Sequence, residues 1–113
     1  MQAKTLLALT FIRNVVSVLP GVTEKICFEM PAFYVGKNIF ARLKEGEEEL
    51  VIHTTDREKW LKLDPLTFYI TPHYQNYKYM LINLALVDPQ ILSELLITAW
   101  KNRATKRLLK QLD

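Results

Sequence analysis

The chain has 113 residues, of which 50% are hydrophobic, 24% charged and 11% aromatic, and its formal net charge is +3. This is the composition of one folded domain and excludes a disordered tail or a fibre. The single cysteine, Cys27, excludes an internal disulfide, a zinc finger and a CxxC redox centre, and the apolar run at residues 6–12 is far shorter than the roughly 20 residues of a membrane span. We therefore expect one domain over residues 1–113, located in the cytoplasm and not in a membrane.

Apolar side chains recur every three or four residues over residues 3–19, which is the spacing of a helix with one buried face. Pro20 and Gly21 then end this helix, because proline cannot continue it and glycine tolerates a left-handed exit. The pattern predicts a first helix whose buried face consists of Ala3, Leu6, Leu7, Phe11, Val15, Val18 and Leu19.

Residues 23–53 form short runs rich in Ile, Phe, Tyr and Val, with turn residues between them. This pattern predicts an antiparallel meander of three or four strands, with hairpin tips at residues 36–38 and 45–48. Cys27 lies in one of these runs, so we expect a buried and unreactive thiol. His53 ends another run, and we expect a structural histidine whose hydrogen bonds are satisfied.

The second half of the chain alternates helix and strand signals. Thr55 and Glu58 have the spacing of a capping box, which predicts a short helix that ends before Pro65. Two strands are predicted at residues 68–70 and 79–86, with a polar loop at residues 71–76 between them. The second strand is almost continuously apolar, which is typical of a strand inside a sheet rather than at its edge.

Asp88 and Pro89 are an N-cap and a first helical residue, and they predict that the last helix begins at Pro89. Its apolar face extends to Leu112, so the helix either continues to the end of the chain or kinks near Asn102. The order of elements predicts an α+β two-layer sandwich, in which helices pack on one face of an antiparallel meander sheet.

Several short motifs follow one another over nearly the whole chain: Leu19 to Glu24, Pro31 to Phe33, Ile39 to Ala41, Phe68 to Tyr74, the strand that ends at Leu84, and Ala99-Trp100. In content and order these motifs resemble those of the MmcQ/YjbR family of small bacterial proteins. The resemblance implies a fold like that of CyaY and frataxin and a double-wing DNA-binding role. Iron binding of the frataxin kind is disfavoured, because no acidic residue precedes Glu24.

The sequence contains no recognisable catalytic or metal-binding set. Its two histidines, His53 and His73, are twenty residues apart with no second ligand at helical or strand spacing. Its three glycines are isolated turn residues and form no phosphate loop. We expect a protein that is not an enzyme and that uses no cofactor or metal.

Positive charge is concentrated at the C-terminus. Residues 1–93 contain ten basic and ten acidic side chains, whereas residues 94–113 contain five basic side chains against Glu94 and Asp113. A concentrated cluster attracts polyanions better than dispersed charge, so we expect weak binding of DNA or another polyanion. The alternative is a solvated helix end whose cations favour the negative pole of the helix dipole. The candidate residues are Lys101, Arg103, Lys106, Arg107 and Lys110, with Lys37 and Lys78 assisting.

Within this cluster, Arg103 and Arg107 are four residues apart, which places them on one face of a continuous helix. The second hairpin tip, residues 44–49, carries four carboxylates around one glycine. Such a tip is repelled from a DNA duplex unless it points away from it. The C-terminal helix is therefore the stronger candidate surface.

A second hypothesis comes from the aromatic segment at residues 73–79. Its rings can stack on unpaired bases or line a site for a small anionic ligand, or can contact another protein. The alternative is that these tyrosines are half-buried sheet residues with hydroxyls in water. The candidate residues are His73, Tyr74, Tyr77 and Tyr79.

Overall fold

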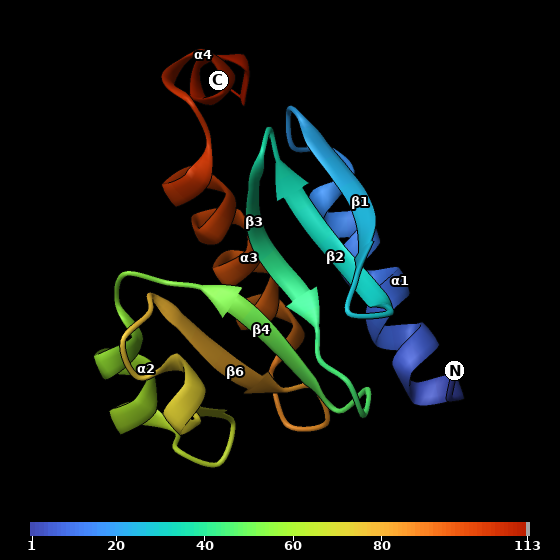
Figure 1. Cartoon of the computed structure of the whole chain (residues 1–113), viewed down its shortest axis with the longest axis vertical. Coiled ribbons are helices and arrows are strands. Elements are labelled where there is room, and N and C mark those ends of the chain that lie inside the picture. The colour runs from blue at the N-terminus through green and yellow to red at the C-terminus, as the bar shows by residue number, and fades with distance from the viewer. Residues whose placement is uncertain (113) are drawn as a thin grey trace.

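The computed structural model describes residues 1–112, which form a six-stranded sheet and its helices (Figure 1). In chain order the elements are α1 (Ala3–Val16), β1 (Val22–Cys27), β2 (Met30–Val35), β3 (Asn38–Leu43), β4 (Glu49–His53), α2 (Arg57–Leu63), β5 (Phe68–Tyr69), the 3₁₀ turn η1 (Pro72–Tyr74), β6 (Tyr79–Asn83), α3 (Pro89–Arg103) and α4 (Lys106–Leu112).

The strand order is β1-β2-β3-β4-β6-β5, and every neighbouring pair is antiparallel. The first four strands are the predicted meander, with the two predicted hairpin tips. β6 lies between β4 and β5, so its apolar sequence is that of an internal strand, as predicted. The first four strands are thus joined by hairpins, whereas the chain passes from β4 to the edge strand β5 and then returns to place β6 between them.

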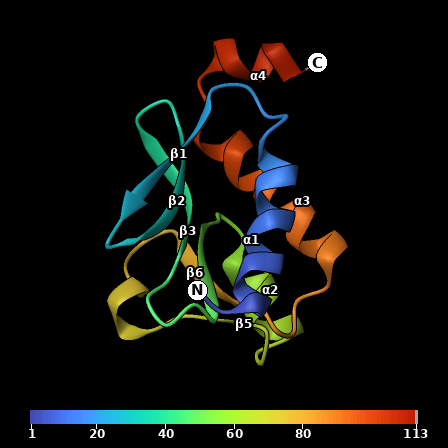
Figure 2. The ribbon, with the colours of Figure 1, turned by 90° about the vertical axis from the view of Figure 1, so that its right-hand side faces the viewer.

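The long helices α1 and α3 lie on the same side of the sheet, and the segment around η1 lies on the other side (Figure 2). This arrangement confirms the predicted α+β two-layer sandwich. Trp100 of α3 is fully buried in the core between the layers, and its Nε1 donates a hydrogen bond to the Pro20 carbonyl at 2.9 Å. The bond joins α3 to the turn that follows α1.

The buried face of α1 differs from the predicted one. Leu9, Ile12 and Val16 are buried in the core. Of the predicted residues, Leu19 is buried and Phe11 and Val15 pack partly against the core, whereas Ala3, Leu6, Leu7 and Val18 are exposed. Apolar residues occur on nearly every side of this helix, so two stripes satisfy the helical spacing. Contact with the sheet selects between the stripes, and this contact cannot be read from the helix alone.

The two predicted helix starts have different outcomes. Asp88 caps α3 as predicted, because its carboxylate accepts a hydrogen bond from the Ile91 backbone N–H. The predicted capping box at Thr55 is wrong, since α2 begins at Arg57 with Asp56 as its N-cap residue and no side-chain cap. Thr54 instead accepts a bond from the Asp56 N–H, which places the helix start one residue later.

The last helix is interrupted, and α3 and α4 are separate helices. Ala104 is extended, with φ −74° and ψ 150°, and Thr105 Oγ1 then accepts a bond from the Leu108 N–H at 3.3 Å. A threonine at this position is a normal N-cap for a new helix. Leu108 packs over Gly21, where a Cβ atom would lie only 2.9 Å from Leu108 Cδ1. The φ of +73° at this position also favours glycine.

Trp100→Phe is expected to lower the free energy of unfolding by about 2 kcal/mol, because it leaves the Pro20 carbonyl without its partner and opens space in the core. The measurement is urea unfolding followed by circular dichroism. Trp60→Phe is the matched control, since Trp60 is only half-buried. Equal effects of the two substitutions would show that the Trp100 bond contributes nothing.

Candidate functional site

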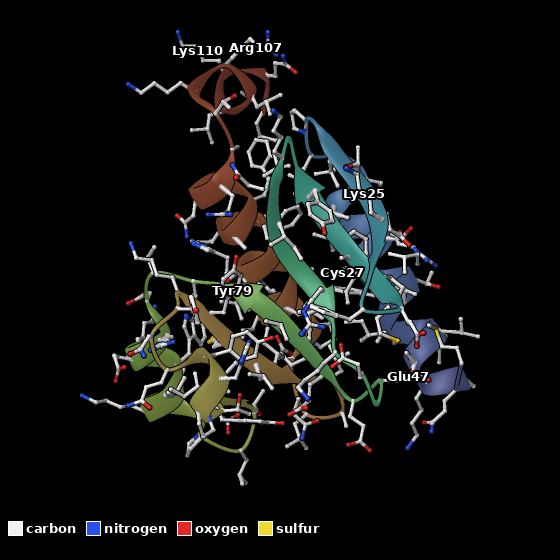
Figure 3. All side chains as sticks on the ribbon, viewed as in Figure 1. Lys25, Cys27, Glu47, Tyr79, Arg107 and Lys110 are labelled. Carbon is white, nitrogen blue, oxygen red and sulfur yellow. The ribbon has the colours of Figure 1, made fainter. Side chains whose placement is uncertain are left out.

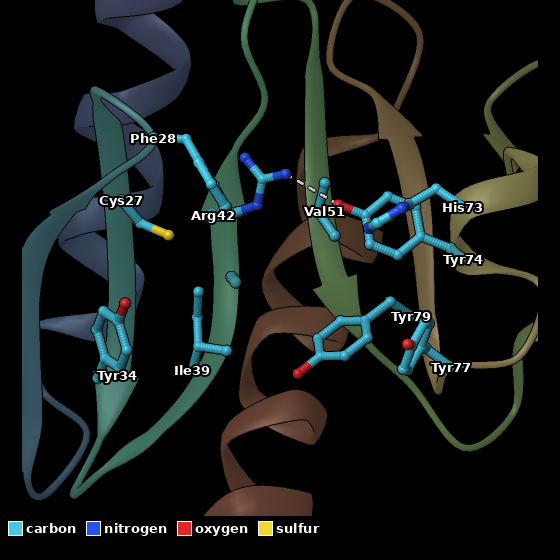
Figure 4. A pocket seen from close by; sticks show the side chains of 11 residues that line it. Cys27, Phe28, Tyr34, Ile39, Arg42, Val51, His73, Tyr74, Tyr77 and Tyr79 are labelled. Atoms are coloured by element: carbon cyan, nitrogen blue, oxygen red, sulfur yellow. Dashed lines mark hydrogen bonds between the residues drawn. The ribbon is translucent and has the colours of Figure 1, made fainter.

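The open face of the sheet carries a cleft with a volume of about 300 Å³ (Figure 4). Ile39 and Ala41 of β3 and Val51 of β4 form its floor. One side is lined from the β1–β2 hairpin, and the other side from the segment between η1 and β6. The cleft is therefore built from four separate stretches of the chain.

The register of the sheet explains why an isoleucine reaches this floor. Phe33 pairs with Ala41 and Tyr34 pairs with Ile39, so Phe40 is an extra residue on β3 at this point. Such a bulge bends the strand. Phe40 is fully buried in the helix-covered core, while Ile39 lines the cleft on the open face.

Arg57 holds one wall of the cleft in place. Its guanidinium donates hydrogen bonds to the backbone carbonyls of Tyr74, Gln75, Tyr77 and Tyr79. A planar group with five donors can satisfy several carbonyls of one loop at once. The segment of residues 74–79 is therefore wrapped around a single side chain from α2.

Arg42 closes one end of the cleft. Its Nη2 donates to the Tyr74 hydroxyl at 2.9 Å and its Nη1 to the Glu45 carboxylate at 2.8 Å, and the guanidinium lies 5.2 Å from the centre of the Phe28 ring. Burial lowers the pKa of Arg42, but the bonds to Tyr74 and Glu45 raise it by more. The group is thus a fixed cation in a neutralising pair.

The structure brings the four predicted stacking residues together in the wall that Arg57 holds, opposite the β1–β2 hairpin. His73 and Tyr77 are exposed, Tyr79 is half-buried and Tyr74 is buried. The rings of His73 and Tyr74 meet edge to face at 4.7 Å between centres. Tyr74 is the least available of the four, because its ring packs with Val51 and Leu81 and its hydroxyl is bonded to Arg42.

Cys27 is not the buried thiol that the sequence predicts. It ends β1 with its side chain half-buried, and it lines the cleft beside Phe28 and Tyr34. β1 is an edge strand whose residues are mostly exposed, so an apolar run here does not mean burial.

His53 is buried at the end of β4, as expected, but its hydrogen bonds are incomplete. Nδ1 has no partner, and the ring packs edge to face on Tyr79 at 5.4 Å. Burial lowers the pKa of His53 below 6.5, and the positive charges of Arg103 and Lys78 lower it further. Lys78 directly precedes Tyr79, and Arg103 donates a hydrogen bond to the carbonyl of Ile39, so both cations lie near this end of the cleft.

The remaining predicted cations lie at the end of the molecule where α4 packs. Lys106, Arg107 and Lys110 are exposed on α4. Lys101 is exposed in the last turn of α3, and Lys37 is exposed at the β2–β3 tip. None of them forms an ion pair within residues 1–112. We call this group, together with Arg103, the basic end.

Arg103 has a different position from the predicted one. It is half-buried in α3, its Nε donates to the Ile39 carbonyl at 3.2 Å, and its own carbonyl accepts from Asn38 Nδ2 at 3.2 Å. Because the helix breaks at Ala104, Arg103 and Arg107 do not share a helix face. Arg103 joins the basic end to β3 instead of standing free in solvent.

The acidic hairpin tip lies far from these cations. Figure 3 shows Glu47 near the N-terminus, and Arg107 and Lys110 at the opposite end of the long axis. Glu47 accepts a bond from the Gln2 N–H, and Glu45 is paired with Arg42. The acidic tip therefore lies far from the cations of α4 and points away from them.

Within residues 1–112, no group of three or more His, Cys, Asp or Glu side chains is arranged to hold a metal ion. The same part of the chain has no helix of the length and apolarity that crossing a membrane requires.

The sequence reading missed Arg42, Arg57 and Tyr34 as parts of the site. Alternation along β3 gives the only signal for Arg42, because Ile39 and Arg42 fall on the open face once the bulge at Phe40 is known. Arg57 carries no signal, since its partners are carbonyls 17 to 22 residues away.

Arg57→Gln is expected to lower the free energy of unfolding by about 2 kcal/mol and to speed amide exchange at residues 74–79, because glutamine cannot reach the four carbonyls. Hydrogen exchange and urea unfolding measure the two effects. Lys59→Gln on the same helix is the control and should change stability by less than about 0.5 kcal/mol, since its ion pair is exposed. Unchanged exchange in Arg57→Gln would exclude the proposed role.

The free energy of unfolding is expected to fall as the pH is lowered through 6.5. The pKa of His53 is lower in the folded state than in the unfolded state. As the pH falls, the unfolded chain therefore binds a proton at His53 before the folded protein does, and this lowers the free energy of unfolding. His53→Gln should remove this part of the fall between pH 7 and 5.5, whereas His73→Gln, at an exposed position, should keep it. The check is urea unfolding at several pH values, and identical pH profiles of the two variants would contradict the assignment.

Comparison with known proteins agrees with this architecture. A sequence model of the YjbR family matches residues 17–102, which include all six strands, α2 and most of α3. The crystal structure of Deinococcus radiodurans protein DR2400, with a domain of family DUF419, has the same fold, with a TM-score of 0.69 and 22% identity over 89% of this chain and 84% of that chain. Curated proteins gave no match. Because the family match spans the whole sheet, the chain belongs to the YjbR family, as its motifs predict.

Proposed function

We propose that this protein is a non-enzymatic, cytoplasmic domain that binds nucleic acid weakly through the basic end. The observation that carries the proposal is the group of exposed cations on α4, Lys106, Arg107 and Lys110, which have no acidic partner within residues 1–112. Lys37 and Lys101 extend the same surface. Arg103 is half-buried and is hydrogen-bonded to Asn38 and Ile39 at the start of β3.

The physical argument rests on spacing and on distance from acidic groups. Three to five cations on one surface can contact several phosphates of one strand, and each contact releases a counterion. The carboxylates of the β3–β4 tip lie at the other end of the molecule, so they do not oppose the approach of a polyanion there. Phosphate contacts of this kind carry no sequence preference.

The position of the two hairpin tips bears on the double-wing mode. The β2–β3 tip carries Lys37, and the next residue, Asn38, donates a hydrogen bond to the carbonyl of Arg103 at the end of α3. The β3–β4 tip is acidic and points away. We therefore propose that one hairpin, with α4, contacts the nucleic acid, and that the other hairpin does not.

A second candidate function is favoured by the cleft, whose volume suits a small molecule. In this alternative the protein is a binding module for a small anionic ligand or a protein segment, and His73, Tyr77 and Tyr79 contact it. A thermal shift with anionic metabolites but none with DNA would favour this function.

For the first function, binding of labelled DNA should depend strongly on salt. If three to five phosphates are contacted, log affinity falls against log salt with a slope of about −3 to −4.5. Replacing Lys106, Arg107 and Lys110 by Gln should weaken binding and make the slope shallower by about 2 to 3. Fluorescence anisotropy at several salt concentrations measures both quantities.

The matched control is the variant with Lys4, Lys59 and Lys62 replaced by Gln, since these lysines are exposed on α1 and α2 and the change in net charge is the same. If both triple variants weaken binding equally, the attraction comes from net charge and not from the basic end.

A further inference from the structure

The cleft and the basic end are parts of one continuous surface. Ile39 of the cleft floor accepts a hydrogen bond from Arg103 through its carbonyl, and Tyr79 of the cleft wall packs on His53. His53 in turn lies within the electrostatic reach of both Arg103 and Lys78. The end of the cleft at Ile39 and Tyr79 is therefore the end next to the basic end.

The two ends of the cleft differ in charge. At the end near Ile39 and Tyr79, the cations of Arg103 and Lys78 have no ion-pair partner within residues 1–112. At the far end, Arg42 is paired with Glu45, and Glu29 adds a further carboxylate. A ligand that fits this polarity has an anionic group at the first end and an uncharged flat part inside the cleft.

The side of the cleft formed by the β1–β2 turn is held in an unfavourable conformation. Phe28 and Glu29 both have positive φ values, 50° and 67°, in a two-residue turn that normally selects Asn-Gly. The Phe28 ring is nevertheless 71% exposed, so burial of this ring does not compensate for the strain. Strain of this kind is typical of residues that are kept for contact with a ligand.

We propose that the cleft receives an unpaired base of a single-stranded nucleic acid, while its phosphates lie on the basic end. This inference rests on the proposed function and names its ligand more narrowly. The aromatic rings of Tyr34, Tyr77 and Tyr79 supply stacking surfaces, which accept every base because each base has a π-face. A base within a duplex cannot enter the cleft, since its faces are already covered by its neighbours.

The experiment compares four probes at one salt concentration: a ten-residue thymidine strand, an abasic strand of equal length, a hairpin duplex and free thymidine monophosphate. The thymidine strand and the abasic strand carry the same phosphates and differ only in bases. We expect the thymidine strand to bind about 5- to 150-fold more tightly than the abasic strand, which corresponds to one stacked base. Fluorescence anisotropy measures the strands, and NMR shifts at Ile39 and Tyr79 locate the base.

Two variants test the cleft itself. Tyr77→Leu removes a ring that is 59% exposed, so folding is not expected to suffer, and the preference for the thymidine strand should fall about fivefold or more. Phe28→Asn combined with Glu29→Gly should raise Tm while weakening the same preference, because it relieves the turn and removes a ring. Leu66→Ala, at an exposed apolar residue outside the cleft, is the control and should bind as the unchanged protein does.

The outcomes separate this inference from the proposed function. If thymidine and abasic strands bind equally with a steep salt dependence, the base is not in the cleft, and the proposed function stands. If no strand binds in dilute buffer, both are wrong. If thymidine monophosphate shifts the NMR signals of the cleft residues and the thymidine strand does not, the ligand of the cleft is a free nucleotide and the inference is wrong. A preference lost in both cleft variants and kept in Leu66→Ala would support the inference.

Discussion

The architecture depends on one constraint, which is that two long helices cover only one face of a sheet that is apolar on both faces. The covered face forms the core around Trp100. The other face has to cover Val51 and Leu81 by other means, and the segment around η1 does so with Tyr74. This cover is partial, and the cleft is the part of the open face that the segment leaves uncovered.

That partial cover is held by one side chain. Without hydrogen bonds from Arg57, four carbonyls of residues 74–79 would turn to water, and the segment that carries the tyrosines would lose its fixed backbone path. The site therefore depends on α2, a short helix that contributes no lining residue. Its electrostatics depend in turn on the opposite end of the chain, where the cations of α3 and α4 are gathered.

Local signals in the sequence predicted the elements well and their assembly less well. The meander, the internal position of β6 and the cap at Asp88 follow from turn residues, continuous apolarity and a short-range hydrogen bond, all of which lie within a few residues. The buried face of α1 and the exposure of Cys27 depend on what packs against them. Thr105 is an N-cap signal that the sequence does contain, and it explains the break between α3 and α4.

The joint at Ala104 and Thr105 separates α3, which buries five side chains in the core, from α4, which has no fully buried residue. α4 lies beyond residues 17–102, which match the family model, and its Leu108 packs over Gly21 in the turn before β1. Leu108 and Leu109 are partly buried against the core. Substitutions of Lys106, Arg107 or Lys110 can therefore change the charge of α4 without repacking the interior, whereas substitutions of Leu108 or Leu109 cannot. The charge at this end of the molecule can thus vary independently of the cleft, whose lining residues all lie between Cys27 and Tyr79.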